Sequence, residues 1–169
     1  MFMTCLYDCL FNLPDETATD AFGQRFARAL NTLGFPDFPG LHVHLTGDPG
    51  VGKTALVRAT LRALGYTGIV PSPTYTLVEP YSVQLDNRQN LTIYHFDLYR
   101  FSHPMEWYDA GFNDYFGPRT LCLLEWPEKA GDIGPPDIVF SLEFTQEGQA
   151  RQLTARAFSQ PGVSCLEKC

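Results

Sequence analysis

The segment from Gly47 to Thr54 has the residue types and the spacing that bind a phosphate group. Its sequence, Gly-Asp-Pro-Gly-Val-Gly-Lys-Thr, fits the pattern G-x-x-x-x-G-K-[ST] of the P-loop. The glycines allow backbone angles that a side chain forbids, so that successive N–H groups can point at one phosphate. Lys53 can reach the β- and γ-phosphates, and the Thr54 hydroxyl can bind Mg²⁺. We predict nucleotide contacts from the loop and the residue after it, namely Gly47, Asp48, Gly50, Val51, Gly52, Lys53, Thr54 and Ala55.

Two carboxylates each follow an apolar stretch that is typical of a buried strand. Asp97 follows residues 91–96, and Glu125 follows residues 120–124. Ligands bind beyond the carboxyl ends of parallel strands, where P-loop proteins place acidic side chains to hold Mg²⁺ or to orient the attacking water. Many strands end in an acid, so the P-loop in the same chain is what favours a functional interpretation of Asp97 and Glu125.

Three hydroxyls alternate along one polar stretch, at Ser72, Thr74 and Thr76. Pro71 and Pro73 exclude a helix there, and the residues after Pro73 are typical of a strand. The hydroxyls could contact a nucleotide or its metal ion, whereas composition alone favours an ordinary polar loop that leads into a strand.

Two histidines, His42 and His44, alternate within an apolar stretch and could suggest a metal site. No third ligand lies near them in the sequence, so we predict packed or partly exposed histidines.

The five cysteines include one C-x₃-C pair near each end of the chain, Cys5 with Cys9 and Cys165 with Cys169. A zinc site that joins the two pairs is conceivable. The usual zinc spacing is nearer C-x₂-C, so we favour reduced thiols.

The elements that must position the candidate groups begin with a strand and a helix around the P-loop. Residues 41–46 predict the strand, and residues 54–64 predict the helix. Asp15 predicts the N-cap of an earlier helix. The apolar face of that helix carries Ala18, Phe22, Phe26, Leu30 and Leu33.

The remaining segments predict strands and one more helix around this centre. Residues 4–13 predict an edge strand, residues 82–90 a hairpin loop, and residues 104–116 a helix weakened at Gly111. The last third predicts an antiparallel hairpin that extends the sheet at one edge, with strands at 137–144 and 151–157 and a turn at 146–149.

Composition limits the class of protein. The 169 residues predict one domain, residues 1–169, with 44% hydrophobic and 18% charged residues. The net charge of −7 makes the chain a poor nucleic-acid binder on its own, because neutralising phosphates normally supplies that affinity. No apolar run approaches the ~18 residues of a membrane span. The first eight residues lack a basic region, so we expect no signal peptide and a cytoplasmic location.

Several of these stretches together resemble one family, the bacterial ATPase of tRNA threonylcarbamoyladenosine synthesis, of the TsaE (YjeE) type. Outside the P-loop, the matching stretches occur in the family's order and at its spacing, across roughly residues 13–130. They are Asp15-Glu16-Thr17 with Gly23, Ser72-Pro73-Thr74-Tyr75-Thr76-Leu77-Val78, His95-Phe96-Asp97-Leu98-Tyr99-Arg100 and Glu125-Trp126-Pro127-Glu128.

The resemblance implies an α/β fold of the P-loop nucleotide-binding type, with parallel central strands and antiparallel flanking strands. It implies an ATPase that uses Mg²⁺ and works with the threonylcarbamoyl transferase catalytic subunit and its paralogous partner subunit. That pair modifies adenosine 37 of ANN-decoding tRNAs, so tRNA is reached only through the complex.

By matching position, the resemblance also implies roles for single residues. Thr54 and Glu125 are similar to Mg²⁺ ligands, and Asp97 is similar to the residue that handles the catalytic water or supports the metal. The Ser72–Thr76 stretch resembles a switch loop, Trp126 resembles an important neighbour of the site, and Thr17 lies where the family approaches the adenine. Pro49 departs from the family's usual Leu, and the terminal cysteine pairs lie outside the family's pattern.

Two other classes of protein remain open from the sequence: a small-molecule P-loop kinase and a non-catalytic, nucleotide-gated interaction module. A kinase usually needs a basic lid over the phosphates, whereas arginines after Lys53 are scattered, among them Arg58, Arg62, Arg88, Arg100 and Arg119. The guanine motif [NT]-K-x-D does not occur, which disfavours GTP.

Overall fold

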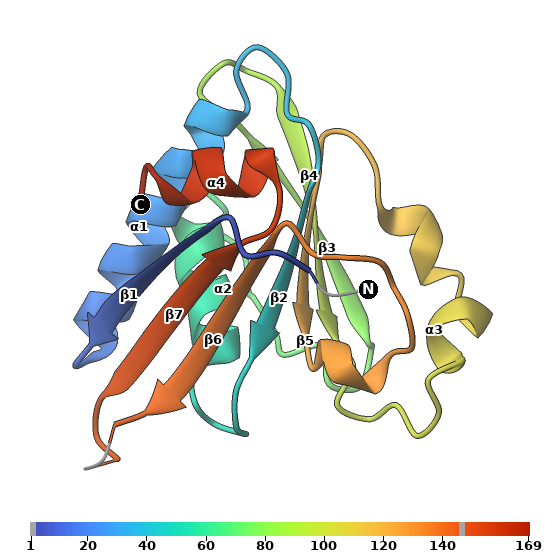
Figure 1. The fold of residues 1–169 in the computed structure, drawn as a ribbon. Helices are drawn as coiled ribbons and strands as arrows, with labels where there is room; N and C mark the ends of the chain where they lie inside the picture. The colour runs from blue at the N-terminus through green and yellow to red at the C-terminus, as the bar shows by residue number, and fades with distance from the viewer. Residues whose placement is uncertain (1–2, 146–147) are drawn as a thin grey trace.

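The computed structural model describes residues 3–145 and 148–169 and forms a seven-stranded sheet in the order β1-β7-β6-β2-β5-β4-β3 (Figure 1). The pairs β2–β5, β2–β6 and β4–β5 are parallel, whereas β1–β7, β6–β7 and β3–β4 are antiparallel. This arrangement confirms the predicted α/β fold with parallel central and antiparallel flanking strands. The strands are β1 Tyr7–Leu13, β2 Leu41–Thr46, β3 Val78–Gln84, β4 Asn90–Asp97, β5 Thr120–Glu125, β6 Ile138–Phe144 and β7 Arg151–Ala157.

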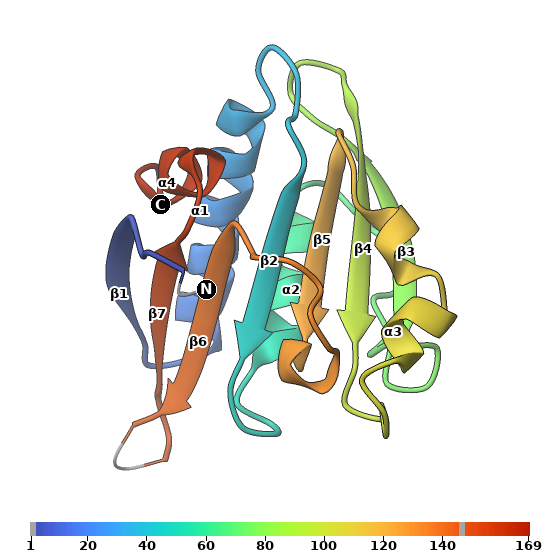
Figure 2. The ribbon, with the colours of Figure 1, turned by 45° about the vertical axis from the view of Figure 1, so that its right-hand side comes forward.

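Two apolar clusters pack on opposite faces of the sheet, and Figures 1 and 2 show the helices beside these faces. Alternating residues of β4 and β5 divide between the clusters because successive strand residues point to opposite faces. Leu91, Ile93 and Leu121 join the core beneath α1 and α2, whereas Phe96 and Leu124 pack with the α3 region. The helices are α1 Glu16–Leu33, α2 Lys53–Ala63, α3 Glu106–Asp109 and α4 Gln160–Leu166, with short 3₁₀ helices η1 Phe112–Tyr115 and η2 Pro127–Lys129.

Helix α1 begins as the sequence predicts, because the Asp15 side chain accepts a hydrogen bond of 2.9 Å from the Ala18 backbone N–H. Gly23 then lets α1 approach α2 closely. A Cβ atom at Gly23 would lie 2.7 Å from Cβ of Ala59, closer than such atoms pack. The contact helps fix α2, and with it the residues at the start of α2, against the rest of the core.

The predicted helix over residues 104–116 is wrong as a single element. The chain forms α3 and η1 instead, and Gly111 between them adopts a left-handed φ of 74°. The predicted 82–90 loop is also too long, because β3 continues to Gln84 and buries Val83. The α4 helix was not predicted, although Ser159 caps it by accepting a 3.1 Å hydrogen bond from the Gly162 backbone N–H.

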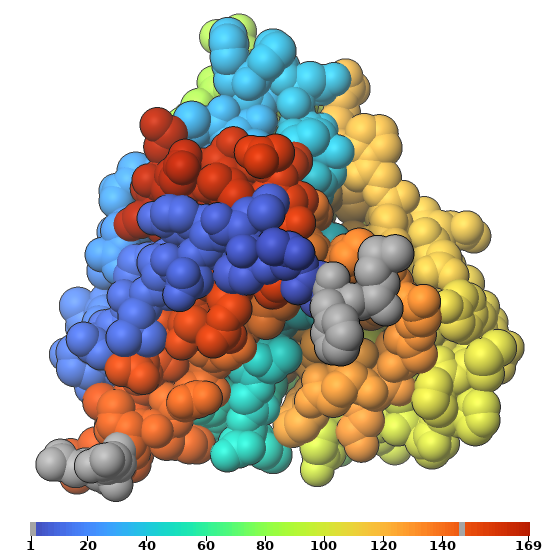
Figure 3. All heavy atoms as spheres, in the orientation of Figure 1, coloured from blue at the N-terminus to red at the C-terminus, as the bar shows by residue number. Residues whose placement is uncertain are grey.

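The C-terminal hairpin lies inside the sheet, which corrects the predicted edge position. Strand β6 pairs with β2, and β7 is covered by β1, which is the edge strand that residues 4–13 predict. Figure 3 shows β1, in blue, at the surface beside α4, in red. The predicted turn at 146–149 includes residues 146–147, which lie outside the described residues.

His42 and His44 are packed, as the sequence predicts. Their Nε2 atoms lie 3.2 Å apart, and the His42 ring centroid lies 4.3 Å from that of Phe116. Burial lowers the pKa of His42 to about 4, and burial with the neighbouring His42 lowers the pKa of His44 to about 3.

The five cysteine thiols, all of which lie in the described parts of the chain, are free. Among residues 3–145 and 148–169, no group of three or more His, Cys, Asp or Glu side chains has the arrangement of a metal site. Within the same residues, no helix combines the length and the apolar character needed to cross a bilayer.

Candidate functional site

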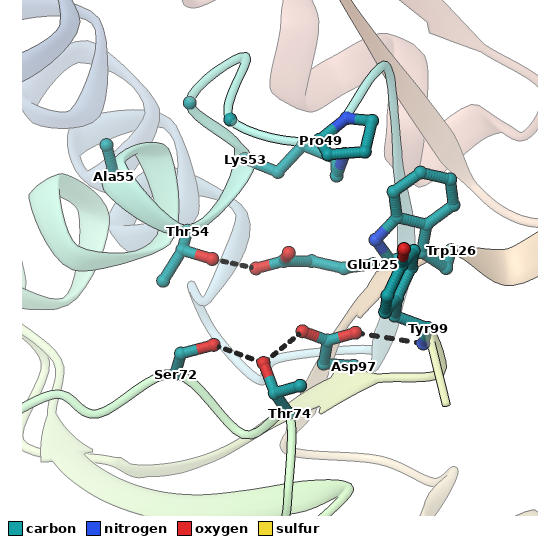
Figure 4. Close-up of a pocket in the computed structure, with 12 residues that line it drawn as sticks. Pro49, Lys53, Thr54, Ala55, Ser72, Thr74, Asp97, Tyr99, Glu125 and Trp126 are labelled. Carbon is teal, nitrogen blue, oxygen red and sulfur yellow. Dashed lines mark hydrogen bonds between the residues drawn. The ribbon is translucent and has the colours of Figure 1, made fainter. Parts of the chain in front are cut away.

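An open pocket of about 380 Å³ lies where β2, β4 and β5 end and α2 begins (Figure 4). Most of the candidate residues meet there, although they come from four separate stretches of the chain. The lining residues are Pro49, Gly50, Gly52, Lys53, Thr54, Ala55, Ser72, Thr74, Asp97, Tyr99, Glu125 and Trp126.

The glycines of the P-loop adopt the backbone angles that the sequence predicts. Gly47, Gly50 and Gly52 have φ values of 142°, 78° and 112°, all in the region that disfavours a side chain. At Gly47 an added Cβ atom would also lie 2.4 Å from the Leu142 backbone oxygen. Val51 is buried in the main core, which anchors the loop from within.

The Lys53 side chain is folded back onto its own loop. Its ammonium group donates to the backbone oxygen of Gly47 and, at 3.1 Å, to that of Asp48. The same Nζ atom lies 4.2 Å from the centroid of the Trp126 ring, within the range of a cation–π contact. Burial lowers the pKa of Lys53, and this effect is opposed by nearby carboxylates, Glu125 first among them.

The two carboxylates lie side by side because β4 and β5 are parallel and pair Asp97 with Glu125. Both side chains are buried. Glu125 reaches across to the start of α2, where its Oε1 atom accepts a 2.7 Å hydrogen bond from the Thr54 hydroxyl (Figure 4). Hydroxyl and carboxylate oxygens are the ligands that Mg²⁺ prefers, so Thr54, Glu125 and Asp97 could together hold this ion.

Asp97 is held by the polar stretch before β3. Thr74 donates to Asp97 Oδ2 at 3.1 Å, and the Ser72 hydroxyl lies 2.8 Å from that of Thr74. The second oxygen, Oδ1, accepts from the Tyr99 backbone N–H at 3.0 Å. Ser72 and Thr74 therefore connect a surface loop directly to a carboxylate of the pocket.

Thr76 departs from this pattern, because its hydroxyl donates to Glu79 at 2.8 Å and the residue does not line the pocket. The strand expected directly after Pro73 begins only at Val78. Leu77 has a left-handed φ of 69°, so the backbone turns there before the strand starts.

A further group of candidate residues does not line the pocket, namely Thr17, Gly47, Asp48 and Val51. Thr17 is exposed in the first turn of α1. The P-loop residues Gly47 and Asp48 line a separate hollow beside β6. Val51 is buried in the main core instead. Figure 3 shows the loop region in teal at the lower edge of the molecule, beside the orange hairpin.

Sequence reasoning missed two side chains of the site. Tyr99 packs its ring against Trp126, with the centroids 5.0 Å apart. His95 is fully buried, and its Nε2 atom lies 2.8 Å from Glu125 Oε1. For His95 the sequence did carry a signal, because His95 follows Leu91 and Ile93 on the inward face of β4, two residues before Asp97.

The fold and the pocket define a class of α/β protein. In this class the central parallel strand leads through a Gly-x-x-x-x-Gly-Lys-Thr loop into a helix, and two carboxylates end the neighbouring strands. The comparison with known proteins is more specific. The family model described as threonylcarbamoyl adenosine biosynthesis protein TsaE matches residues 13–154, and the chain belongs to this family.

Individual relatives agree with the family assignment. The chain is 40% identical over 145 residues to the tRNA threonylcarbamoyladenosine biosynthesis protein TsaE of Haemophilus influenzae, which covers 85% of this chain and 87% of the relative. It is 36% identical over 126 residues to the protein of the same name from Synechocystis sp., covering 70% of each chain. The crystal structure of Bacillus subtilis YdiB has the same fold, with a TM-score of 0.62 at 24% identity, over 96% of this chain and 94% of that chain.

Proposed function

We propose that this protein binds and hydrolyses Mg-ATP in support of tRNA N6-threonylcarbamoyladenosine formation at adenosine 37. The relatives are named for this biosynthesis, and the family match spans residues 13–154. The observation that carries the ATP part is the convergence of Thr54, Glu125 and Asp97 beside the glycine loop in one pocket. A phosphate-binding loop and a set of oxygen ligands at one place fit a nucleotide with its metal ion.

The residues present fit Mg-ATP in the chemistry that they offer. The backbone N–H groups at the start of α2 and the positive end of this 11-residue helix favour a phosphate. Lys53 supplies a positive charge, and Thr54 and Glu125 would hold the metal. A bound Mg²⁺ would neutralise negative charge on the phosphates. Asp97, fixed by Thr74 and by the backbone at Tyr99, would orient the attacking water.

The Ser72–Thr76 loop would carry the nucleotide state to the surface. The Thr74 hydroxyl bonds to Asp97 and to the Ser72 hydroxyl, so a change at the γ-phosphate would alter the loop. We propose that the loop is sensed by the threonylcarbamoyl transferase catalytic subunit and its paralogous partner. The net charge of −7 supports tRNA contact through that pair rather than through this chain.

Reconstitution with the purified transferase subunits and tRNA tests the proposal. We expect slow ATP hydrolysis by the protein alone, faster hydrolysis with the pair, and repeated rounds of modification only with the wild type. Asp97→Asn should bind ATP but fail to support repeated rounds. The proposal is wrong if the wild type changes neither the modification yield nor its own ATPase rate in this mixture.

The same mixture distinguishes the two other classes. A nucleotide-gated module would support repeated modification even as Asp97→Asn, because binding alone would suffice. A kinase would produce ADP faster when its small-molecule substrate is added, and that molecule would gain the phosphate.

A further inference from the structure

His95 occupies a position that the strand pattern reserves for an apolar side chain. On β4, Leu91, Ile93 and His95 all point to the face that packs against α2, and all three are 0% exposed. An aliphatic residue would continue the core there. An imidazole must instead be accommodated with both of its nitrogen atoms away from water.

One nitrogen of this imidazole is bonded to Glu125. The His95 Nε2 and Glu125 Oε1 atoms lie 2.8 Å apart, and Thr54 donates to the same Oε1 at 2.7 Å. An ionised carboxylate only accepts hydrogen bonds, so Nε2 must carry the hydrogen. Two donors therefore hold one oxygen of Glu125, one from β4 and one from α2.

The two carboxylate oxygens of Glu125 differ in their hydrogen bonding. Within residues 3–145 and 148–169, no hydrogen bond reaches Oε2, whereas both oxygens of Asp97 accept one. The pair of donors on Oε1 limits rotation of the carboxylate. Glu125 lines the pocket, so this constraint keeps its second oxygen available there.

The other nitrogen of His95 has no partner. Nδ1 is buried and makes no hydrogen bond among the described residues. An unpaired buried acceptor opposes folding, and a residue present only to fill space would not bring one. The bond to Glu125 is the feature that distinguishes His95 from the aliphatic residues around it.

We propose that His95 is a positioning residue for Glu125. Its Nε2–H bond fixes Oε1 beside Thr54 and leaves Oε2 to the divalent cation. This inference rests on the proposed function, because it concerns the cation that accompanies the nucleotide. Outer partners of metal ligands typically change metal affinity by about 10–100-fold when they are removed.

Two substitutions at position 95 separate positioning from packing. His95→Leu fills the space without a donor, and His95→Gln places an amide N–H near the position of Nε2. Calorimetric titration with ADP measures the Kd in Mg²⁺ and the Kd in EDTA. The coupling ratio, Kd in EDTA divided by Kd in Mg²⁺, reports how much the metal strengthens ADP binding. We expect His95→Leu to lower this coupling ratio at least about tenfold while the Kd in EDTA changes little, and His95→Gln to restore most of the ratio.

A neighbouring core residue provides the matched control. Ile93→Val removes buried volume from the same face of β4, so it should lower the Tm and leave the coupling ratio unchanged. In a Glu125→Gln background, His95→Leu should produce no further loss of coupling, because the two residues act through one bond.

Three results would overturn the inference. The first is an equal loss of ADP affinity in Mg²⁺ and EDTA for His95→Leu, which indicates packing alone. The second is an unchanged coupling ratio in that variant. The third is a wild type whose ADP binding does not respond to Mg²⁺, which contradicts the proposed function itself and is seen before any variant is made.

A metal-free measurement keeps the test independent of how well His95→Leu folds. In ¹⁵N NMR spectra of the wild type without metal, His95 should show a protonated Nε2 and an unprotonated Nδ1. Its signals are identified by their loss in His95→Gln. The opposite tautomer would exclude the bond to Glu125 and refute the inference.

Discussion

Single residues determine what the pocket can bind. Lys53 brings the positive charge, Thr54 brings a hydroxyl at the first turn of α2, and Glu125 is bonded to that hydroxyl at 2.7 Å. Thr54 and Glu125 hold each other across two elements, whereas Lys53 is bonded to the backbone of its own loop. On the proposed function, each can be removed with a distinct effect on nucleotide binding or turnover.

Lys53→Ala and Thr54→Ala remove the charge and the metal ligand, respectively. We expect either change to lower the Mg-ATP affinity or the turnover by at least about tenfold, equivalent to about 1.4 kcal/mol. Titration with a fluorescent ATP analogue and an ADP-release assay measure both quantities. Lys168→Ala, at an exposed position on the C-terminal segment, is the control and should have no effect. Wild-type values in both site variants would rule out the P-loop interpretation.

The two carboxylates should differ in what they support. Glu125→Gln should weaken the binding that depends on Mg²⁺, because it removes charge beside Thr54. Asp97→Asn should leave ATP bound and slow its hydrolysis, because it alters the group that orients water. Calorimetry and single-turnover hydrolysis separate the two effects, and the reverse pattern would exchange the assigned roles.

At the scale of elements, the site depends on a loop that joins α2 to β3. Ser72 and Thr74 extend from this loop to Asp97, and the backbone turns at Leu77 before β3 begins. The strands are held by ladders of backbone bonds. The loop, by contrast, is held to the pocket by the Thr74 side chain and by one backbone bond, from the Asp97 N–H to the Leu77 oxygen. Such a segment can change its order without disturbing the sheet.

Hydrogen exchange tests whether the loop senses the γ-phosphate. With a non-hydrolysable ATP analogue, residues 72–76 should exchange more slowly than with ADP, since the additional phosphate would order the loop. Residues 151–157 of β7, on the far side of the sheet, serve as the internal reference. Equal protection of residues 72–76 in the two states would make this an ordinary loop.

The sequence was informative where the signal is local. The glycine pattern predicted the left-handed angles at Gly47, Gly50 and Gly52, and Asp15 predicted a cap. At Gly111 the local signal was present, but its effect was underestimated, because the left-handed glycine divides the expected helix. The sequence failed where tertiary pairing decides, since β1 displaces the hairpin from the edge of the sheet. Tyr99 and His95 were missed as site residues because their partners lie 27 and 30 positions away in the sequence.

At the scale of the whole molecule, stability should depend on pH through the His42–His44 pair. Burial lowers the pKa values to about 4 and about 3, from 6.5 in the unfolded chain. Between pH 6.5 and about 4 the unfolded state therefore binds protons that the folded state does not. The free energy of unfolding should fall as the pH decreases through this window, by about 2 kcal/mol or more at pH 5.

Urea denaturation at pH 7 and pH 5 measures this dependence. A His42→Val/His44→Val double variant should lose much less stability between the two pH values than the wild type. His103→Gln, at an exposed position, should behave like the wild type. An equal pH dependence in the double variant would show that other groups control acid stability.

Lys53 donates to the Gly47 and Asp48 carbonyl oxygens, so these oxygens compete with any ligand for its ammonium group. On the proposed function, a bound phosphate would replace these intramolecular acceptors, so the observed affinity would be the intrinsic affinity multiplied by the fraction of molecules in which Lys53 is released. That release would also take the ammonium group away from the Trp126 ring, which it now contacts at 4.2 Å. The other tryptophan, Trp107, is fully buried in the α3 layer, so it should contribute a constant background. The fluorescence emission of Trp126 should therefore report the position of Lys53 without any added label.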